Sequence, residues 1–238
     1  MGRAVEELAV VMPVYNEKDA VAAVLESWSR TLLELEINYR IHVYNDGSKD
    51  TTLEVLHDMS KKDGSITVHD KLNSGHGPTI LLGYRENMAS DWIFQVDSDN
   101  EMPPNSFAQL WGKRASYDFL LGKRAGRDSA LPRKIISFIS RLIVRCFYGR
   151  GIWDVNSPYR LMRVSRFKDK YERIPADTFA PNVIISGMAC LDKLRICELP
   201  VAHQSRQTGE VSIKKWKLFK AALRSMLQTV LFRVKYAR

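Results

Sequence analysis

Cysteine is scarce in this chain of 238 residues, and Cys146, Cys190 and Cys197 form no CxxC pair or regular spacing. That scarcity excludes a disulfide framework and favours buried, reduced thiols. No uninterrupted apolar run reaches the ~18 residues that a membrane span requires. The acidic start, residues 1–7, is unlike a signal peptide. We therefore expect a cytoplasmic protein that does not cross a bilayer by itself.

Acidic and basic residues are unevenly distributed. Residues 1–100 carry 9 Lys and Arg against 17 Asp and Glu, a net charge of −8, whereas residues 101–238 carry 27 against 10, a net charge of +17. The asymmetry indicates an anionic partner for the second part, such as nucleic acid, an anionic membrane or a phosphate-bearing substrate. At 45% hydrophobic residues the chain can bury a substantial core. It is most simply one domain over residues 1–238.

Apolar periodicity predicts alternating strands and helices in the first hundred residues. The expected strands are 8–14, 39–44, 66–69 and 92–96, and the expected helices are 19–35, 51–60 and 78–88. This order predicts an α/β fold with a mostly parallel central sheet flanked by helices. Ligands bind such sheets at the carboxyl ends of the strands.

The fourth expected strand is followed directly by acidic residues. Alternation along an extended chain points Asp97, Asp99 and Glu101 to one side. Converging carboxylates need a cation, and oxygen ligands suit Mg²⁺ or Mn²⁺, which would hold a diphosphate. The alternative is an acidic turn that caps a helix started by Pro103 and Pro104.

Polar motifs also follow the other three strands, at residues 13–17 (PVYNE), 45–48 (NDGS) and 73–77 (NSGHG). Each motif alone is typical of a turn. Together, four strands bring polar residues to one rim of the sheet, and this pattern predicts a binding site.

With these motifs at these spacings, nearly the whole chain resembles the inverting family-2 glycosyltransferases, which have a GT-A fold. The resemblance implies a nucleotide-diphospho-sugar donor, bound by a Rossmann-like half at residues 1–100. Asp97 and Asp99 would lie at the metal and diphosphate. Asn45 stands where the family usually has an acid. The implied donor-binding residues are Pro13, Tyr15, Glu17, Asp46, Asn73 and Gly75.

Residues 97–104 (DSDNEMPP) are similar to the polyprenyl-phosphate glycosyltransferases, the dolichol-phosphate mannose synthase group. In that group a third side chain, two residues after the second Asp, joins the metal. Glu101 holds this position, so the implied metal ligands are Asp97, Asp99 and Glu101, with Mg²⁺ or Mn²⁺ as the cofactor. The group often has Gln there, and a Glu would favour the ion further.

An acceptor half at residues 101–212 also resembles this group, through residues 122–124 (GKR), 154–160 (DVNSPYR) and 203–212 (HQSRQTGEVS). Arginine suits bidentate phosphate recognition, although an arginine on an exposed helix can simply be solvated. Pro158 replaces a usual Gly, and Ile213 a frequent Lys. The implied acceptor-site residues are Arg124, Arg133, Ser137, Asp154, Ser157, Arg160, Arg206 and Ser212.

The resemblance implies transfer of a sugar, from a GDP-mannose or UDP-glucose type of donor, to a polyprenyl or dolichyl phosphate. An anionic lipid phosphate needs no general base. The residues expected to carry catalysis are Asp97, Asp99, Arg124 and Asp154, with Asp154 orienting guanidinium groups, Arg160 among them. The alternative is a family-2 enzyme acting on a hydroxyl acceptor in polysaccharide or lipid-linked oligosaccharide synthesis. Asp154 or Asp177 would then be the base.

Residues 214–238 hold eight basic residues and no acid, with apolar residues at helical spacing. This pattern is typical of an interfacial amphipathic helix, or of a helix that packs on its own domain. Residues 133–148 are a second candidate. We expect a peripheral protein on the cytoplasmic face of an anionic membrane, with a membrane-anchoring partner protein. Nucleic acid is excluded as a partner because no recognition helix or zinc finger is present.

Overall fold

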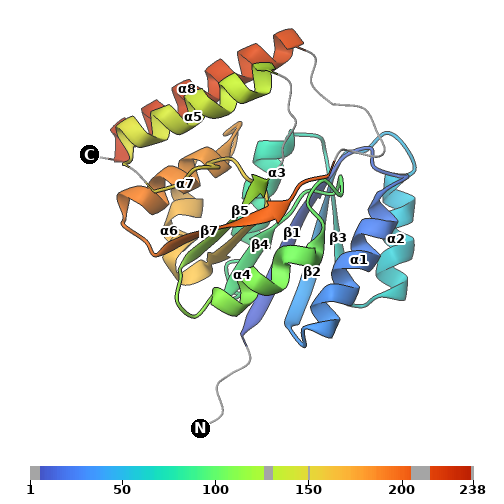
Figure 1. The fold of residues 1–238 in the computed structure, drawn as a ribbon. Helices are drawn as coiled ribbons and strands as arrows, with labels where there is room; N and C mark the ends of the chain where they lie inside the picture. The colour runs from blue at the N-terminus through green and yellow to red at the C-terminus, as the bar shows by residue number, and fades with distance from the viewer. Residues whose placement is uncertain (1–5, 126–130, 150, 205–214, 237–238) are drawn as a thin grey trace.

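A seven-stranded sheet runs through the computed structural model, which describes residues 6–125, 131–149, 151–204 and 215–236. The strand order is β3-β2-β1-β4-β6-β5-β7 (Figure 1). Every adjacent pair is parallel except the two that β6 makes with β4 and β5. The strands are β1 (Glu7–Val14), β2 (Asn38–Asp46), β3 (Ile66–Lys71), β4 (Trp92–Gln95), β5 (Phe119–Ala125), β6 (Arg160–Arg163) and β7 (Ile196–Ala202). The expected mostly parallel α/β class is confirmed.

The first four strands are where their apolar runs predict them. β1 is buried from Leu8 to Val14 and lies between β2 and β4, with Leu8 opposite Tyr39 and Trp92. Helices cross over between these strands: α1 (Val21–Glu34), α2 (Thr52–Lys62) and α3 (His76–Glu86). Because β1, β2 and β4 are parallel, the polar residues that follow their carboxyl ends lie at the same edge of the sheet.

One face of the sheet is covered by α1, α2 and α4 (Phe107–Lys113), the last entered through the 3₁₀ turn η1 (Pro104–Ser106). Trp28 of α1 packs on Phe94 of β4 with ring centroids 5.1 Å apart, and Phe94 packs on Phe107 at 4.7 Å. Burying a side chain of this size stabilises the fold by about 1.5–3 kcal/mol. The aromatic cluster therefore fixes β4, and with it the acidic residues that follow.

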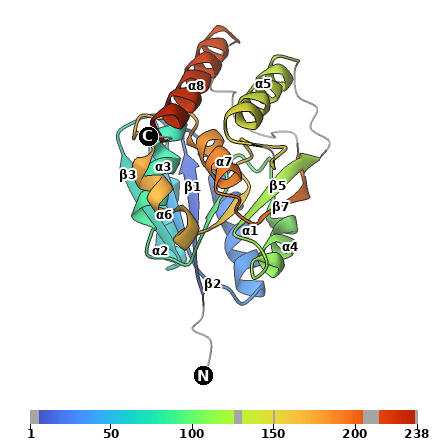
Figure 2. The same ribbon diagram turned by 90° about the vertical axis from the view of Figure 1, so that its left-hand side faces the viewer.

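The other face is covered by α3, α6 (Val164–Arg173) and α7 (Pro181–Leu191). Helices α5 (Leu131–Phe147) and α8 (Lys215–Tyr236) lie side by side beyond α7 (Figures 1 and 2). The Tyr148 hydroxyl donates a 2.6 Å hydrogen bond to the carbonyl of Thr229 and so joins them. Over the described residues, no helix has both the length and the hydropathy needed to cross a membrane.

Candidate active site

A pocket lies between the turn that follows β4 and the carboxyl end of β5. Its lining residues are Asp97, Asp99, Glu101, Met102, Arg124 and Pro158. The three carboxylates expected to converge thus border one pocket, and Arg124 adds a positive charge beside them. The chain is not extended here, however, because Asn100 has a φ of 57° and the Glu101 N–H donates to Asp99 Oδ1 at 3.1 Å. A turn, and not strand alternation, brings Glu101 to the pocket.

The helix-cap alternative finds no support in this turn. Neither η1 nor α4 has a hydrogen bond from a side chain at its N-cap, and the N-cap residue of η1 is Pro103. The turn is instead held by the two residues that follow β7: His203 Nε2 lies 3.1 Å from Glu101 Oε2, and the Gln204 N–H donates to the Glu101 carbonyl at 2.8 Å.

Asp97 is held from the interior of the protein. Gln95, fully buried, donates a 2.9 Å hydrogen bond from Nε2 to Asp97 Oδ1. The Gln95 Oε1 atom accepts from the Tyr84 hydroxyl at 3.1 Å and from Asn182 Nδ2 at 2.8 Å. His76 Nε2, in the first turn of α3, lies 3.7 Å from Asp97 Oδ1. The sequence reasoning did not single out Gln95. The signal that could have identified it is its position as a polar residue in the otherwise apolar strand β4.

The acidic side chains of the pocket suit a hard divalent metal ion, because all three offer carboxylate oxygens as ligands. Within the described residues, no three His, Cys, Asp or Glu side chains are grouped closely enough to hold a metal ion. Mg²⁺ commonly takes only one or two carboxylates and completes its shell with substrate phosphates and water. Asp97 and Asp99 fit that kind of site.

Arg124 and Asp154 form a bidentate ion pair beside the pocket. Arg124 Nε and one terminal nitrogen donate to the two Asp154 oxygens, each at 2.7 Å. Both side chains are largely buried, so this pair is stronger than a surface salt bridge. The Asp154 N–H in turn donates to Glu198 Oε1 at 2.9 Å. Asp154 therefore orients a guanidinium group, as expected.

The arginine that Asp154 orients is Arg124, which corrects the expected pairing with Arg160. Arg160 is fully buried, and its guanidinium donates to the carbonyls of Ser157, Asn182 and Val155 at 2.8, 3.1 and 3.3 Å. Burial lowers the pKa of Arg160. The buried Ser157 hydroxyl donates to the Gly122 carbonyl at 2.5 Å. Both side chains hold the segment that carries Asp154 and Pro158.

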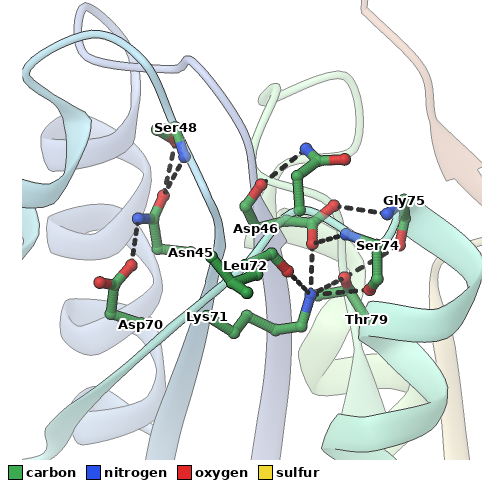
Figure 3. A network of polar contacts seen from close by, with 10 residues as sticks. Asn45, Asp46, Ser48, Asp70, Lys71, Leu72, Ser74, Gly75 and Thr79 are labelled. Atoms are coloured by element: carbon green, nitrogen blue, oxygen red, sulfur yellow. Dashed lines mark hydrogen bonds and ion pairs between the residues drawn. The ribbon is translucent and has the colours of Figure 1, made fainter.

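The end of β2 is joined to the loop after β3 by Asp46 (Figure 3). Asp46 Oδ1 accepts from the Lys71 ammonium and from the Ser74 N–H at 2.8 Å, and Oδ2 accepts from the Gly75 N–H at 2.9 Å. Burial acts to raise the pKa of Asp46, but these hydrogen bonds outweigh it and lower the pKa below its usual 3.8. Asn73 Nδ2 donates to the Asp46 carbonyl at 2.7 Å. Asp46 thus fixes the loop that leads into α3.

The loop after β1 is tied to the loop after β2. The Glu17 N–H donates to Thr52 Oγ1 at 2.9 Å, and the Asn16 N–H donates to Ser48 Oγ at 3.0 Å. Glu17 is buried and Tyr15 half-buried, while Pro13 lies inside the sheet. Asn45 is also fixed, because Nδ2 donates to Asp70 Oδ1 at 2.7 Å (Figure 3).

The remaining expected residues lie apart from the pocket or outside the described residues. Ser137 is exposed on α5. Asp177 is exposed and pairs with Arg224 of α8 at 3.2 Å. Arg206, Ser212 and the side chain of Arg133 lie outside what the structure describes.

Comparison with known proteins identifies the class. The family model for glycosyl transferase family 2 matches residues 9–169, and the chain belongs to this family. Undecaprenyl-phosphate 4-deoxy-4-formamido-L-arabinose transferase of Pseudomonas aeruginosa is 30% identical over 217 residues, which cover 90% of this chain and 62% of that protein. The enzyme of that name from Serratia proteamaculans is 26% identical over 220 residues, which cover 90% of this chain and 65% of that enzyme. The chain thus spans less than two thirds of the length of these relatives. Their names confirm the resemblance to the polyprenyl-phosphate group.

Solved structures share the fold. Glucosyl-3-phosphoglycerate synthase of Mycobacterium tuberculosis, in complex with Mn²⁺, UDP-glucose and phosphoglyceric acid, has a TM-score of 0.71 at 14% identity over 96% of this chain and 80% of that one. Mannosyl-3-phosphoglycerate synthase of Rubrobacter xylanophilus has a TM-score of 0.71 at 11% identity, over 98% of this chain and 75% of that one. The chain therefore has the expected GT-A fold.

Proposed function

We propose that this protein transfers a sugar, with inversion, from a nucleotide-diphospho-sugar to a polyprenyl phosphate. The observation that carries the proposal is the pocket in which Asp97, Asp99 and Glu101 face Arg124. It combines groups for a metal-bound diphosphate with a cation for a second phosphate. The undecaprenyl-phosphate transferases among the relatives support a lipid-phosphate acceptor. The UDP-glucose complex of a structural neighbour supports a nucleotide-sugar donor.

Asp97 and Asp99 would hold Mg²⁺ or Mn²⁺, and the Glu101 side chain, which lines the same pocket, would have to move toward the ion to become a third ligand. When bound, the ion would neutralise the charge of the departing nucleoside diphosphate. Gln95 and the turn at Asn100 hold the carboxylates in place before the ligand arrives, which lowers the cost of assembling the site. The further donor-binding residues in this proposal are Pro13, Tyr15, Glu17, Asp46, Asn73 and Gly75.

The acceptor phosphate would be oriented by Arg124, which Asp154 holds rigidly. An anionic phosphate can attack the sugar without a general base. Asp154 is engaged by Arg124 and Asp177 by Arg224, so each candidate base for a hydroxyl acceptor already has a cationic partner. This favours the phosphate acceptor. The other acceptor-site residues in the proposal are Arg133, Ser137, Ser157, Arg160, Arg206 and Ser212.

The outer layer of α5 and α8 would rest on an anionic membrane, at its cytoplasmic face. Large apolar side chains on these helices are exposed: Phe138, Leu142, Phe147, Leu223, Leu227, Leu231 and Val234. The sequence of α8 holds six basic residues and no acidic one. Apolar side chains combined with a positive charge suit an anionic lipid surface. A membrane-anchoring partner protein belongs to the same proposal.

The test is nucleoside diphosphate release, measured by chromatography, from a panel of nucleotide sugars with a short-chain polyprenyl phosphate and Mg²⁺ or Mn²⁺. We expect release that needs both lipid phosphate and metal, and the panel also identifies the donor. Asp99→Asn should abolish it, whereas Asp58→Asn, an exposed position on α2, should not. Transfer only to hydroxyl acceptors would replace this proposal with the alternative.

A further inference from the structure

Trp153 is an exposed tryptophan beside the candidate active site, with two cations on its ring. Its exposed fraction is 56%. The Arg141 guanidinium carbon lies 3.8 Å from the ring centroid, and the Lys123 ammonium lies 4.9 Å from it. These distances are within the range of cation–π attraction. We refer to Lys123, Arg141 and Trp153 as the cation–Trp cluster.

The cluster is fixed to the active-site pocket on two sides. The Trp153 N–H donates to Glu198 Oε2 at 2.8 Å, and the same carboxylate holds the next residue, Asp154. Asp154 in turn holds Arg124, which lines the pocket. Lys123 precedes Arg124 in β5, and neighbouring strand residues point to opposite faces of a sheet. The cluster is therefore adjacent to the pocket but lies on the α5 side of β5.

Among the described residues, no carboxylate forms an ion pair with Lys123 or Arg141. The acids on the neighbouring segment are already engaged, Asp154 by Arg124 and Glu198 by two main-chain N–H groups. A guanidinium stacked on an aromatic ring still presents N–H donors at its edge. Both cations contact the same ring, and charged N–H donors of this kind are suited to a phosphate.

Apolar surface continues from the cluster along α5. The Arg141 guanidinium carbon also lies 5.5 Å from the ring centroid of Phe138, which is exposed. A ligand held here would meet two cations and two aromatic rings together. That combination matches a phosphate monoester on an apolar chain better than a free phosphate or a neutral lipid.

We propose that the cation–Trp cluster is an entry subsite for the lipid-phosphate acceptor. Lys123 and Arg141 bind its phosphate, and Trp153 and Phe138 hold the first units of its chain. The inference rests on the proposed function, since it names where the acceptor of that reaction is first bound. It adds Lys123, Arg141, Trp153 and Phe138 to the residues that determine acceptor specificity.

The first test is kinetic, with farnesyl phosphate as the acceptor. The double variant Lys123→Ala/Arg141→Ala and the single variant Trp153→Ala should each raise the apparent acceptor KM by about tenfold, with the donor KM unchanged. Trp153→Phe should recover part of the loss, because a smaller ring still attracts the cations. Lys168→Ala, exposed on α6, is the matched charge control. Wild-type acceptor KM in the double variant and in Trp153→Ala would overturn the inference.

The second test measures binding without turnover, by tryptophan fluorescence. Farnesyl phosphate should change the emission of the wild-type protein, and the change should be lost in Trp153→Phe and weakened about tenfold in affinity in the double variant. Inorganic phosphate and farnesol serve as probes of each half of the ligand. A response to either that equals the response to farnesyl phosphate would overturn the inference.

The two tests separate this inference from the proposed function. Absence of lipid-dependent turnover in the wild-type protein would contradict the proposed function, and the fluorescence titration would then decide the role of the cluster. Binding of farnesyl phosphate that depends on Lys123 and Arg141 would support a lipid-phosphate site even in that case. Binding that is the same in the double variant would overturn it.

Discussion

Gln95 donates a 2.9 Å hydrogen bond from its fully buried amide to the Asp97 carboxylate at the edge of the candidate active-site pocket. The same amide accepts hydrogen bonds from Tyr84 of α3 and Asn182 of α7. A pocket carboxylate is thereby connected to two helices on one face of the sheet. Because each polar atom in this buried network has a partner, the network fixes the orientation of Asp97.

Gln95→Leu should both destabilise the protein and slow transfer. The leucine leaves the Asn182 Nδ2 group without its buried acceptor, which costs about 1–3 kcal/mol, whereas the Tyr84 hydroxyl can still donate to Asn182 Oδ1 at 2.9 Å. It also releases Asp97, so turnover should fall more than donor binding. Thermal unfolding and steady-state kinetics measure the two effects. Gln109→Leu, exposed on α4, makes the same chemical change, and equal stability of the two variants would contradict the role of Gln95.

Lys71→Met should destabilise the protein at neutral pH by roughly 3 kcal/mol, because it leaves the buried Asp46 carboxylate without its cation. The folded-state pKa of Asp46 lies below its usual 3.8. The stabilisation from Asp46 is therefore complete above the unfolded-state pKa and is lost as pH falls through the folded-state pKa. The difference in free energy of unfolding between wild type and Lys71→Met should be complete at neutral pH and shrink below about pH 4.

Lys61→Met is the control for this pH series. Its ion pair with Asp58 on α2 is exposed, so its loss should change stability by under about 1 kcal/mol at any pH. Denaturant unfolding at several pH values measures both variants. A difference for Lys71→Met that stays constant down to pH 2 would show that the Lys71–Asp46 pair does not account for it.

The role of Asp154 can be separated from that of a general base by a double-mutant cycle with Arg124. If Asp154 acts by holding Arg124, then Asp154→Asn should slow transfer about tenfold or more, and Asp154→Asn/Arg124→Ala should be no slower than Arg124→Ala alone. A general base would instead give an additional loss in the double variant. Single-turnover rates with saturating donor provide the measurement.

The first half of the fold could be predicted from the sequence because apolar runs such as that of β1 alternate with helical patterns, and each of the first four strands is followed by a polar motif. β6 and β7 lack that signal. β6 has only four residues, two of them arginines, and β7 contains Glu198 and Pro200. α7 is buried along nearly its whole length, so it has no polar face to reveal a helical period. These elements form only through tertiary packing.

The three carboxylates of the pocket were named from the sequence by strand alternation, and Arg124 through the family resemblance, but their partners were not predicted. Arg124 and Asp154 are 30 positions apart in sequence, and no periodicity relates two segments that meet through β5 and a loop. The pairing of Asp154 with Arg160 was wrong because Arg160 turns inward to main-chain carbonyls. Local pattern gives the direction of a side chain only within a regular element. Strand alternation likewise does not apply to Glu101, because a turn at Asn100 brings this residue to the pocket.

Gly77→Ala should disturb both stability and donor binding, because α3 begins in close contact with the loop before α7. A Cβ at Gly77 would lie 2.1 Å from the Phe179 carbonyl oxygen. That loop cannot easily retreat, since the Phe179 N–H donates to Gln228 of α8 at 2.8 Å. The start of α3 must move instead, together with His76, which lies beside Asp97. We expect a loss of about 1–3 kcal/mol in thermal unfolding and a raised donor KM.

Gly112→Ala, in α4, is the matched control for this prediction. A Cβ there meets no atom within 4 Å, so alanine should stabilise the helix by about 0.5–1 kcal/mol and leave the donor KM unchanged. Stability that rises equally in both variants would mean that α3 and the loop before α7 are not in contact in solution. A lower stability for Gly77→Ala with an unchanged donor KM would mean that the contact supports the fold without positioning the donor site. Opposite shifts in stability, with the donor KM raised only in Gly77→Ala, would support a role for the contact between Gly77 and the loop before α7 in positioning the proposed donor site.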